Sequence, residues 1–290
     1  MTNRRKFLID SSIMAAGTLV IPSVLSAKES IYSVGPELAQ GVGVQVYSVR
    51  NALGKDFNGS MKKLAEIGYT FIEGYGMGTD GMILGKPAKE YKKIVDDLGM
   101  KMVSSHCAFV STPELAAKLR DTAVAAGVSF ATIPSLPGNW QNDYYKVADN
   151  LNKVGEIFKG TGIRLGYHNH SFEFKKTTDG EVPLEILLNN TDKDLVTVQV
   201  DLFWVTVGGY DPLKLIEKFP GRISSFHVKD ANANNEQATI GTGIIDFEAI
   251  FKAGIKDGLE YYYIEDERED DPFGNLKANF AYMNSAKFTR

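Results

Sequence analysis

The 290-residue chain contains a single cysteine, Cys107, and only four histidines. One cysteine excludes an intramolecular disulfide and any zinc site built from several thiolates. A metal site in this chain would therefore need His, Asp and Glu ligands. Cys107 itself is expected to behave as a small buried hydrophobe.

An excess of basic residues is also absent, because 32 Lys and Arg stand against 36 Asp and Glu, for a formal net charge of −4. Nucleic-acid binders usually carry a concentrated basic surface, so no nucleic-acid partner is expected. After residue 30 no run of 18 or more apolar residues occurs, which predicts no membrane span in the body of the chain. With 43% hydrophobic residues the chain can bury a sizeable core, and a small-molecule partner is the default expectation.

The first residues have a different character from the rest. Arg4 and Arg5 are adjacent, an apolar stretch with small residues runs from 13 to 25, and Ser26 and Ala27 follow. This layout is typical of a signal peptide, and "NRRKFL" resembles the twin-arginine signal of bacterial proteins exported already folded. We predict a signal peptide over 1–27, a linker over 28–41 and a periplasmic location with no stable membrane insertion after signal removal. A short amphipathic or disordered N-terminus is the alternative.

From residue 42 onward one pattern recurs at intervals of about 32 residues, the length of a strand plus a helix. An amphipathic helical segment is followed by a glycine and then by a short β-rich run, because glycine adopts the left-handed conformation that ends many helices. The glycines are Gly68, Gly99, Gly127, Gly162, Gly221 and Gly258. The β-rich runs predict eight strands, at roughly 42–47, 70–75, 101–106, 129–134, 163–169, 196–202, 223–229 and 260–266.

The segments between these strands carry helix signals. Phe57, Met61, Leu64 and Ala65 are spaced to lie on one face of a helix. At 111–115, "STPEL" offers a threonine N-cap followed by proline at the first helical position. Eight strand–helix units without a second domain predict a single (β/α)8 TIM barrel over 42–290, with functional groups at the carboxyl ends of its strands. A doubly wound open sheet is the alternative, but no Gly-x-Gly-x-x-Gly turn follows the first strand.

Ligand-type side chains fall at the predicted carboxyl ends of the strands. Each one alone fits a hydrogen-bonded core residue, a loop cap or an ion pair, but together they predict one shared polar site. They are His106, His168, His170, His227, Glu73, Asp201 and Glu265.

Several motifs, in this order and spacing, carry a family resemblance. They are "GVQVYSVR", "IGYTFIEGYG", "YHNHSFEF", "VDLFWVTVGGYDP", "FHVKD" and "YYIEDE". The chain from about 42 to 285 resembles the sugar phosphate isomerase/epimerase family of xylose-isomerase-like TIM barrels, which is also grouped with AP endonuclease type 2.

The resemblance implies a metal site with one ligand from each of strands five to eight, commonly Glu, Asp, His and Glu. The last three correspond to Asp201, His227 and Glu265, and His168 stands where the first glutamate usually does. Two His, one Asp and one Glu suit Mn²⁺, Zn²⁺ or Co²⁺ and disfavour Ca²⁺. His170, on the same strand face as His168, could contact substrate, act as acid or base, or support a ligand.

The resemblance further implies a metal-dependent isomerase or epimerase that forms an enediolate from a hydroxy-ketone or hydroxy-aldehyde. Because a histidine replaces one family glutamate, the base stays open among His106, His170 and Glu73. Lys229 either reaches a substrate oxygen or pairs with Asp230 or another acid. Glu173 is expected to be solvated or ion-paired rather than placed above the metal, and "GTGIID" at 241–246 is expected to form a rim loop, with a phosphate-cradling role only weakly supported.

Other functions compete with this interpretation. The same enolisation can expel a leaving group, which gives a lyase or a deglycosylase of keto-sugar glycosides. A non-catalytic carbohydrate-binding barrel is a third hypothesis. A DNA-repair endonuclease is disfavoured, because its multinuclear metal site would need more than four histidines and because the acidic chain lacks a basic groove. The expected partner is a small carbohydrate, and a homodimer is the candidate assembly.

The N-terminal pattern predicts export by a route for folded proteins. Changing Arg4 and Arg5 together to lysine should leave the protein in the cytoplasm, as cell fractionation would show. Undiminished periplasmic accumulation of the double variant would contradict a twin-arginine signal.

Overall fold

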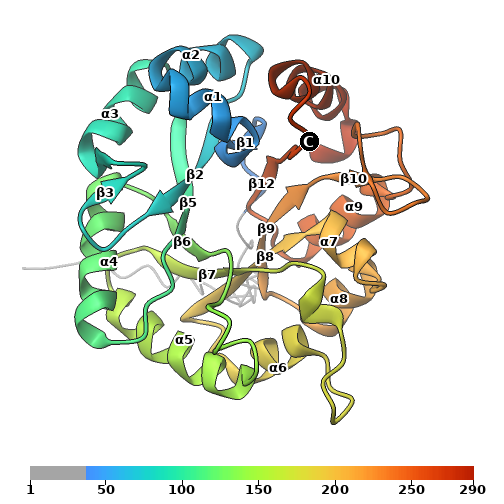
Figure 1. The fold of residues 1–290 in the computed structure, drawn as a ribbon. Coiled ribbons are helices and arrows are strands. Elements are labelled where there is room, and N and C mark those ends of the chain that lie inside the picture. The colour runs from blue at the N-terminus through green and yellow to red at the C-terminus, as the bar shows by residue number, and fades with distance from the viewer. Residues whose placement is uncertain (1–36) are drawn as a thin grey trace, which may run out of the picture. The chain divides into compact units, whose positions relative to one another are not determined.

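Eight parallel β-strands alternate with helices along residues 37–290, the part of the chain that the computed structural model describes. β1 pairs with both β2 and β12, so the sheet closes into a barrel, with Gly43 opposite Phe71 on one side and Tyr263 on the other (Figure 1). The barrel strands are β1 (Gly43–Gln45), β2 (Phe71–Met77), β5 (Lys101–Cys107), β6 (Phe130–Ile133), β7 (Arg164–His168), β8 (Val196–Asp201), β9 (Ile223–Val228) and β12 (Tyr261–Ile264).

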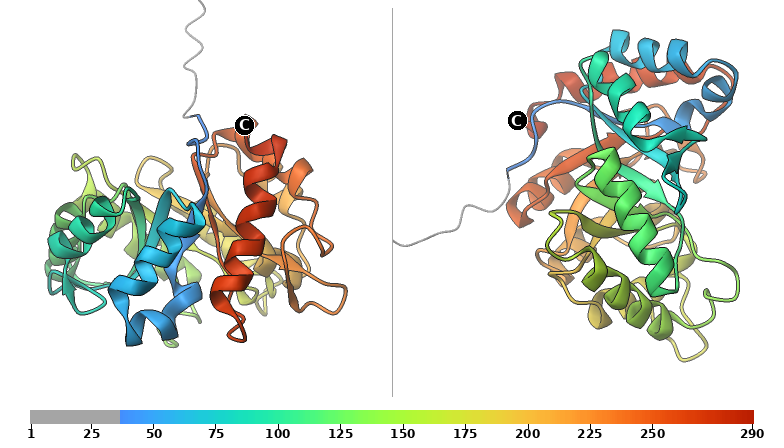
Figure 2. Two further views of the ribbon diagram at one scale, coloured as in Figure 1. Left: turned by 90° about the horizontal axis from the view of Figure 1, so that it is seen from above. Right: turned by 90° about the vertical axis from the view of Figure 1, so that its left-hand side faces the viewer.

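Helices surround the barrel as an outer layer (Figures 1 and 2). The α-helices are α1 (Arg50–Lys55), α2 (Phe57–Ile67), α3 (Ala88–Asp97), α4 (Pro113–Ala126), α5 (Tyr144–Phe158), α6 (Pro183–Asn190), α7 (Leu202–Val207), α8 (Pro212–Lys218), α9 (Phe247–Asp257) and α10 (Pro272–Ser285). Short 3₁₀ helices are η1 (Val46–Val49), η2 (Phe172–Phe174) and η3 (Lys287–Thr289). The last α-helix packs against α2 beside the closure, where the Tyr69 hydroxyl donates to the Leu276 carbonyl at 2.9 Å.

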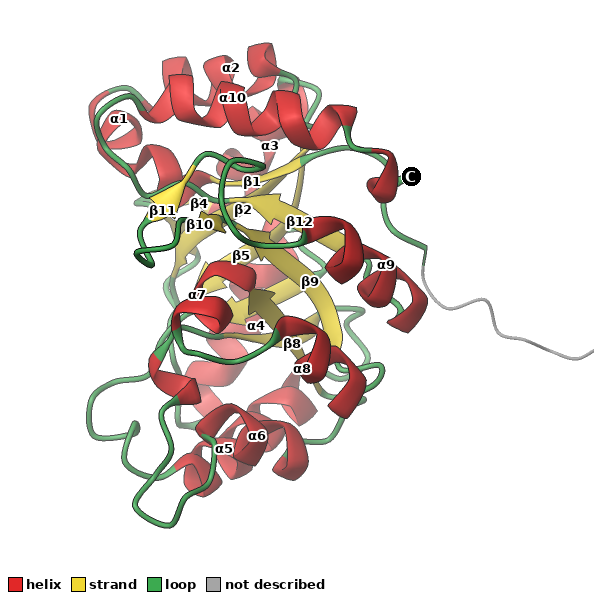
Figure 3. Cartoon of the chain, turned by 90° about the vertical axis from the view of Figure 1, so that its right-hand side faces the viewer, coloured by secondary structure: helices red, strands yellow, loops and turns green. Residues whose placement is uncertain are grey.

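Two antiparallel hairpins extend the segments that follow barrel strands (Figure 3). β3 (Met82–Ile83) and β4 (Lys86–Pro87) follow β2, whereas β10 (Asp230–Ala231) and β11 (Gln237–Ala238) follow β9. Because all eight barrel strands are parallel, their carboxyl ends lie at the same mouth of the barrel. The two hairpins follow strand ends and therefore lie at this mouth as well.

The fold predicted from the sequence is confirmed, and closure of the sheet excludes the doubly wound alternative. Two strand boundaries differ from the prediction in ways that matter for the site. β1 ends at Gln45, whose side chain accepts from the Tyr47 N–H at 3.0 Å and starts η1. β2 continues to Met77 because that residue pairs with β3, so Glu73 lies inside the barrel rather than at the end of its strand.

The predicted helix signals are confirmed in detail. Met61 and Leu64 of α2 are fully buried, and Thr112 Oγ1 accepts from the Leu115 N–H at 3.3 Å to cap α4. Gly127 ends α4 with a φ of +68°, as its left-handed preference predicts. Gly99, Gly162 and Gly221 differ, because the helices before them end at Asp97, Phe158 and Lys218 and each glycine turns the chain two to four residues later.

The predicted signal peptide and most of the predicted linker lie outside the described residues. Within 37–290, none of the helices has the length and apolarity needed to span a lipid bilayer. Cys107 is buried at the end of β5, and burial raises the pKa of its thiol, in keeping with a structural rather than a reactive cysteine.

Candidate functional site

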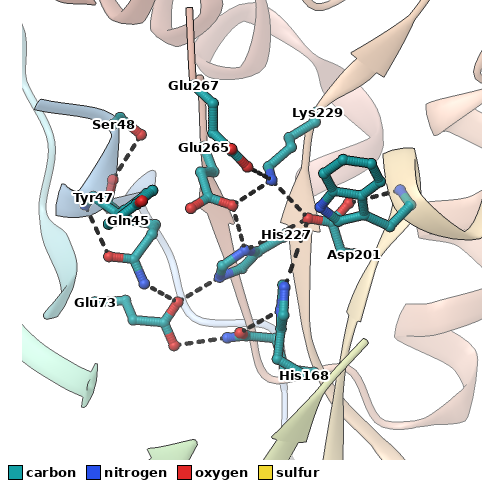
Figure 4. A network of polar contacts seen from close by, with 12 residues as sticks. Gln45, Tyr47, Ser48, Glu73, His168, Asp201, His227, Lys229, Glu265 and Glu267 are labelled. Atoms are coloured by element: carbon teal, nitrogen blue, oxygen red, sulfur yellow. Dashed lines mark hydrogen bonds and ion pairs between the residues drawn. The ribbon is translucent and has the colours of Figure 1, made fainter. Parts of the chain in front are cut away.

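Three ligand-type side chains converge at the mouth from the ends of three consecutive strands. Asp201 is the last residue of β8, His227 the penultimate residue of β9, and Glu265 follows β12 directly. Ligand atoms of all three lie within 4.8 Å of one another, and each residue is buried (Figure 4). His227 Nδ1 lies 3.0 Å from Glu265 Oε2 and 3.8 Å from Asp201 Oδ2. The structure thus brings together the Asp, His and Glu that the resemblance implied.

His168, the last residue of β7, lies beside this cluster. Its Nε2 is 4.0 Å from Asp201 Oδ2, and its ring groups with those of His106 and His227 within the same 4.8 Å criterion. By this criterion His168 is not a member of the cluster of Asp201, His227 and Glu265. Its role as fourth metal ligand stays a prediction.

Gln199 orients two of the histidines. Its Nε2 donates to Glu73 Oε1 at 2.7 Å, and since a carboxylate only accepts, the amide oxygen must point the other way. That oxygen lies 2.9 Å from His106 Nε2 and 3.1 Å from His168 Nδ1. Both nitrogens therefore donate to that oxygen. Burial lowers the pKa of His168 well below its ordinary value, so its ring is neutral and its Nε2 is a lone pair facing the Asp201 side.

Glu73 is enclosed by donors. Gln45 Nε2 donates to it at 2.8 Å and Ser104 Oγ at 2.6 Å, and His227 Nε2 is a further close partner. Burial raises the pKa of this carboxyl, but nearby His106 and His227 and the bonds from His227 and Ser104 outweigh burial and lower it to about 2. Glu73 does not line the cavity at the mouth. The structure therefore does not support its candidacy as the group that exchanges protons with substrate.

Lys229 supplies a buried cation. Its Nζ lies 3.0 Å from Asp201 Oδ2, 2.6 Å from Glu265 Oε2 and 2.6 Å from Glu267 Oε1. Burial lowers the pKa of this ammonium, but the three carboxylates outweigh burial and raise it, so Lys229 stays charged. Of the two predicted roles for Lys229, the structure supports the ion pair, with these acids rather than with Asp230.

His170 lies two residues beyond β7, in the loop before η2. Its Nδ1 is buried without a hydrogen-bond partner, and its ring stacks on Phe172 with centroids 5.4 Å apart. Burial, followed by the Lys229 charge, lowers the pKa of His170 to about 4, so the ring is neutral near pH 7. A neutral imidazole with a free nitrogen can accept a proton.

Glu173 corrects a prediction, because it is neither solvated nor, among the described residues, ion-paired. The side chain is fully buried, accepts from the Tyr167 hydroxyl at 2.6 Å and accepts from the His170 N–H at 2.9 Å. Burial raises the pKa of its carboxyl to about 7. Glu173 fixes the backbone of the loop that carries His170.

A cavity of about 490 Å³ opens above these residues, a size typical of ligand sites. Three histidines, His106, His168 and His170, line it together with Glu265 and Glu267. Apart from Ser135, the rest of the wall is apolar or aromatic and includes the edge-to-face pair Tyr47 and Tyr75, with ring centroids 5.1 Å apart.

Asp230 holds the 241–246 segment through hydrogen bonds to its backbone. Asp230 Oδ2 accepts from the N–H groups of Gly241 and Gly243, both at 2.9 Å, and Oδ1 accepts from the Ile245 N–H at 3.3 Å. Gly243 is required here, since a Cβ would stand 2.3 Å from the Ala231 carbonyl oxygen. The phosphate-cradling role is wrong, because Asp230 already occupies the N–H groups of these glycines.

The residues present fit a divalent metal ion. Asp201 Oδ2 is buried, makes no hydrogen bond of good geometry and faces His227 and Glu265, which gives a mixed N/O donor set. Burial lowers the pKa of His227, but Glu73 and Glu265 outweigh it and raise the value to about 10. Without a metal the ring is therefore an imidazolium between two carboxylates.

The sequence analysis missed four polar partners of this site. Gln45, Ser104 and Gln199 line up behind the histidines, and Glu267 pairs with Lys229 at the mouth. The signal was present for Gln199, which is two residues before Asp201 on β8 and therefore on the same face of the strand.

The barrel and its site define a class: a (β/α)8 enzyme fold with a buried His and carboxylate cluster at the carboxyl ends of the strands. Residues 61–286 match the family model described as a xylose isomerase-like TIM barrel, and the chain belongs to this family.

Among solved structures, a sugar phosphate isomerase/epimerase from Parabacteroides distasonis ATCC 8503 is 30% identical, with a TM-score of 0.77 over 93% of this chain and 100% of that one. A second protein of that description from the same organism is 28% identical, with a TM-score of 0.74 over 86% and 99% of the two chains. Both the fold and the family resemblance inferred from the motifs are confirmed.

Curated relatives carry a different activity in their names. An inosose dehydratase of Clostridium beijerinckii is 27% identical over 153 residues, which is 47% of this chain and 50% of that protein. One from Lacticaseibacillus casei is 28% identical over 165 residues, or 50% and 53%. The chain spans about half the length of these curated relatives.

Metal binding should depend on pH through His227. A ligand nitrogen must lose its proton, so with a pKa raised to about 10 the affinity for Mn²⁺ should rise about tenfold per pH unit from about pH 6 to about pH 8. Calorimetry in two buffers of different ionisation enthalpy should show proton release on binding. Asp201→Ala should lose the metal with an unchanged circular dichroism spectrum. A pH-independent affinity, or full metal occupancy in that variant, would contradict the assignment.

The two histidines of "YHNH" should separate metal binding from turnover. His168→Ala should greatly weaken metal binding, because it removes the lone pair beside Asp201. His170→Ala should keep the metal and lose roughly 10²- to 10⁴-fold in rate, the usual contribution of an acid or base. Elemental analysis and steady-state kinetics measure the two effects, and the opposite pattern would show that the ligand assignment on β7 is wrong.

Proposed function

We propose that the protein is a divalent-metal-dependent isomerase or epimerase that removes a proton from the carbon next to the carbonyl group of a carbohydrate. The observation that carries this proposal is the buried set of Asp201, His227 and Glu265, whose member Glu265 lines a cavity with a neutral histidine, His170, on its wall. Membership of the xylose isomerase-like family and the 30% identical isomerase/epimerase support it.

Asp201, His227 and Glu265 would hold the metal, with His168 as the proposed fourth ligand. Mn²⁺, Zn²⁺ or Co²⁺ suits this donor set. When bound, such an ion polarises a carbonyl group and stabilises the negative charge that develops as the neighbouring carbon loses its proton.

The chain's own residues move that proton. His170 is neutral and lines the cavity, so its unprotonated nitrogen can take the proton and return it to an adjacent carbon or to the opposite face. His106 also lines the cavity, but its Nε2 proton is engaged with Gln199. We assign the base to His170 and a second acid/base position to His106.

Glu73 and Lys229 act as positioning residues. Glu73 accepts from His227 Nε2 and so directs Nδ1 of that ring toward Asp201 and Glu265. The ammonium group of Lys229 lies between three carboxylates, and these ion pairs orient the Asp201 and Glu265 side chains. Neither group needs to touch the substrate for this role.

β-Elimination is the second candidate. It begins with the same loss of a proton and ends with departure of a group from the next carbon, and the curated relatives named inosose dehydratase favour it. A deglycosylase would follow the same course with a sugar as leaving group. A non-catalytic carbohydrate-binding barrel would require neither the buried set of metal ligands nor a neutral histidine on the cavity wall.

Solvent deuterium distinguishes these functions. The Mn²⁺-loaded protein, incubated in D₂O with D-ribulose, D-fructose and an inosose, should place deuterium on the carbon beside the carbonyl, as proton NMR would show. A new epimer or isomer identifies the first function, whereas loss of water identifies elimination.

Asp201→Ala is the control, because it should abolish exchange together with metal binding. Binding of these ketones without any exchange would overturn the enzymatic proposal and favour a carbohydrate-binding barrel.

A further inference from the structure

The cavity contains no free positive charge. Among the described residues that line it, none is a lysine or an arginine, and two are the acids Glu265 and Glu267. The closest buried cation, Lys229, already meets three carboxylates. Proteins that bind a phosphate group usually supply Arg, Lys or free backbone N–H groups to it.

Backbone donors are also unavailable where TIM barrels often bind phosphate, in the loops after strands seven and eight. After β9, the seventh barrel strand, the N–H groups of Gly241, Gly243 and Ile245 point at the Asp230 carboxylate. An anionic side chain of the protein thus stands where a phosphate would bind.

The loop after β12, the eighth barrel strand, is strongly acidic. Residues 265–271 read "EDEREDD", with six acids and one arginine. Arg268 is paired with Asp266 at 2.7 Å, and Arg50, which faces this loop, is paired with Glu269. Each guanidinium is therefore engaged by an acid of this loop.

The charge balance remains unfavourable to an anion after a metal ion binds. Glu73, Asp201, Glu265 and Glu267 contribute four negative charges, and Lys229 contributes one positive charge. A divalent ion adds two, and His227 is neutral as a ligand, so the site keeps about one negative charge by this count. A phosphate dianion would meet repulsion, whereas hydroxyl groups could pair with the acids.

From this arrangement we infer that the substrate is an uncharged polyhydroxylated ketone or aldehyde and that Glu267 helps to exclude its phosphate esters. The inference rests on the proposed function and narrows its substrate class. Tyr47 and Tyr75 suit such a substrate, because their apolar ring surfaces can pack against the carbon-bound hydrogens of a sugar.

Matched pairs of ligands test the inference. Dissociation constants of the Mn²⁺-loaded full chain are measured for D-fructose against D-fructose 6-phosphate and for D-ribulose against D-ribulose 5-phosphate. The uncharged member should bind at least about tenfold more tightly. Equal or tighter binding of the phosphates would overturn the inference.

Glu267→Gln tests the residue assignment, because it removes one charge at the mouth while keeping the size of the side chain. Its preference for the uncharged ligand should fall on the order of tenfold. Glu66→Gln is the matched control: it makes the same charge change on α2, where Glu66 is exposed and lies 3.6 Å from Lys62, and it should keep the wild-type preference. Equal preferences in the two variants would contradict a role for Glu267.

Deuterium exchange separates this inference from the proposed function. Exchange with the phosphorylated ligands alone would overturn the inference while supporting the function. Selective binding of the uncharged ligands without exchange would support the inference while contradicting the function.

Discussion

The contact on which the site depends is the imidazolium of His227 between two carboxylates. Its Nε2 faces Glu73 and its Nδ1 faces Glu265, and all three groups are buried. The three buried acids Glu73, Asp201 and Glu265 would be costly to bury alone, and His227 and Lys229 compensate them only in part. Removing one partner from such a buried pair typically costs about 3–5 kcal/mol, so each charged member of this cluster stabilises the others. A divalent cation is the natural complement to the charge that remains.

Much of the architecture was predictable because two repeating patterns are strong in this sequence. One is the alternation of helix, glycine and strand, and the other is the spacing of apolar residues along the helices. The alternation of amphipathic helices, glycines and β-rich runs indicated the eight strands, and the capping signal at Thr112 located the start of α4. The residues at the strand ends could also be assigned to one mouth, since parallel strands in a barrel share their direction. The ends of β1 and β2 could not be predicted from the sequence, because they depend on the Gln45 cap and on the pairing of Met77 with β3.

Side-chain partners in the site were harder to foresee. Glu73 looked like a strand-end acid, but a strand that ends two residues later than predicted places it among four donors inside the barrel. The partners of Lys229 lie on β8 and after β12, far apart in sequence, whereas the adjacent Asp230 points away to hold a loop. The direction in which a side chain points at the end of a strand follows from its local twist and from the loop beyond, which no periodic pattern records.

Closure of the barrel links the site to the order in which the structure can form. Gly43 and Tyr263 are the most distant partners in the sheet, so their pairing carries the largest loop-closure entropy of any pair of barrel strands. The contacts of the site cross this seam: Gln45 on β1 bonds to Glu73, which meets His227, which meets Glu265 beyond β12. A chain that lacks this pairing has an open edge on each side of the gap, and the contact of Glu73 with His227 that links the two edges is not held. The complete site is therefore a property of the closed barrel, and a metal ion held there would bind the finished fold in preference to its precursors.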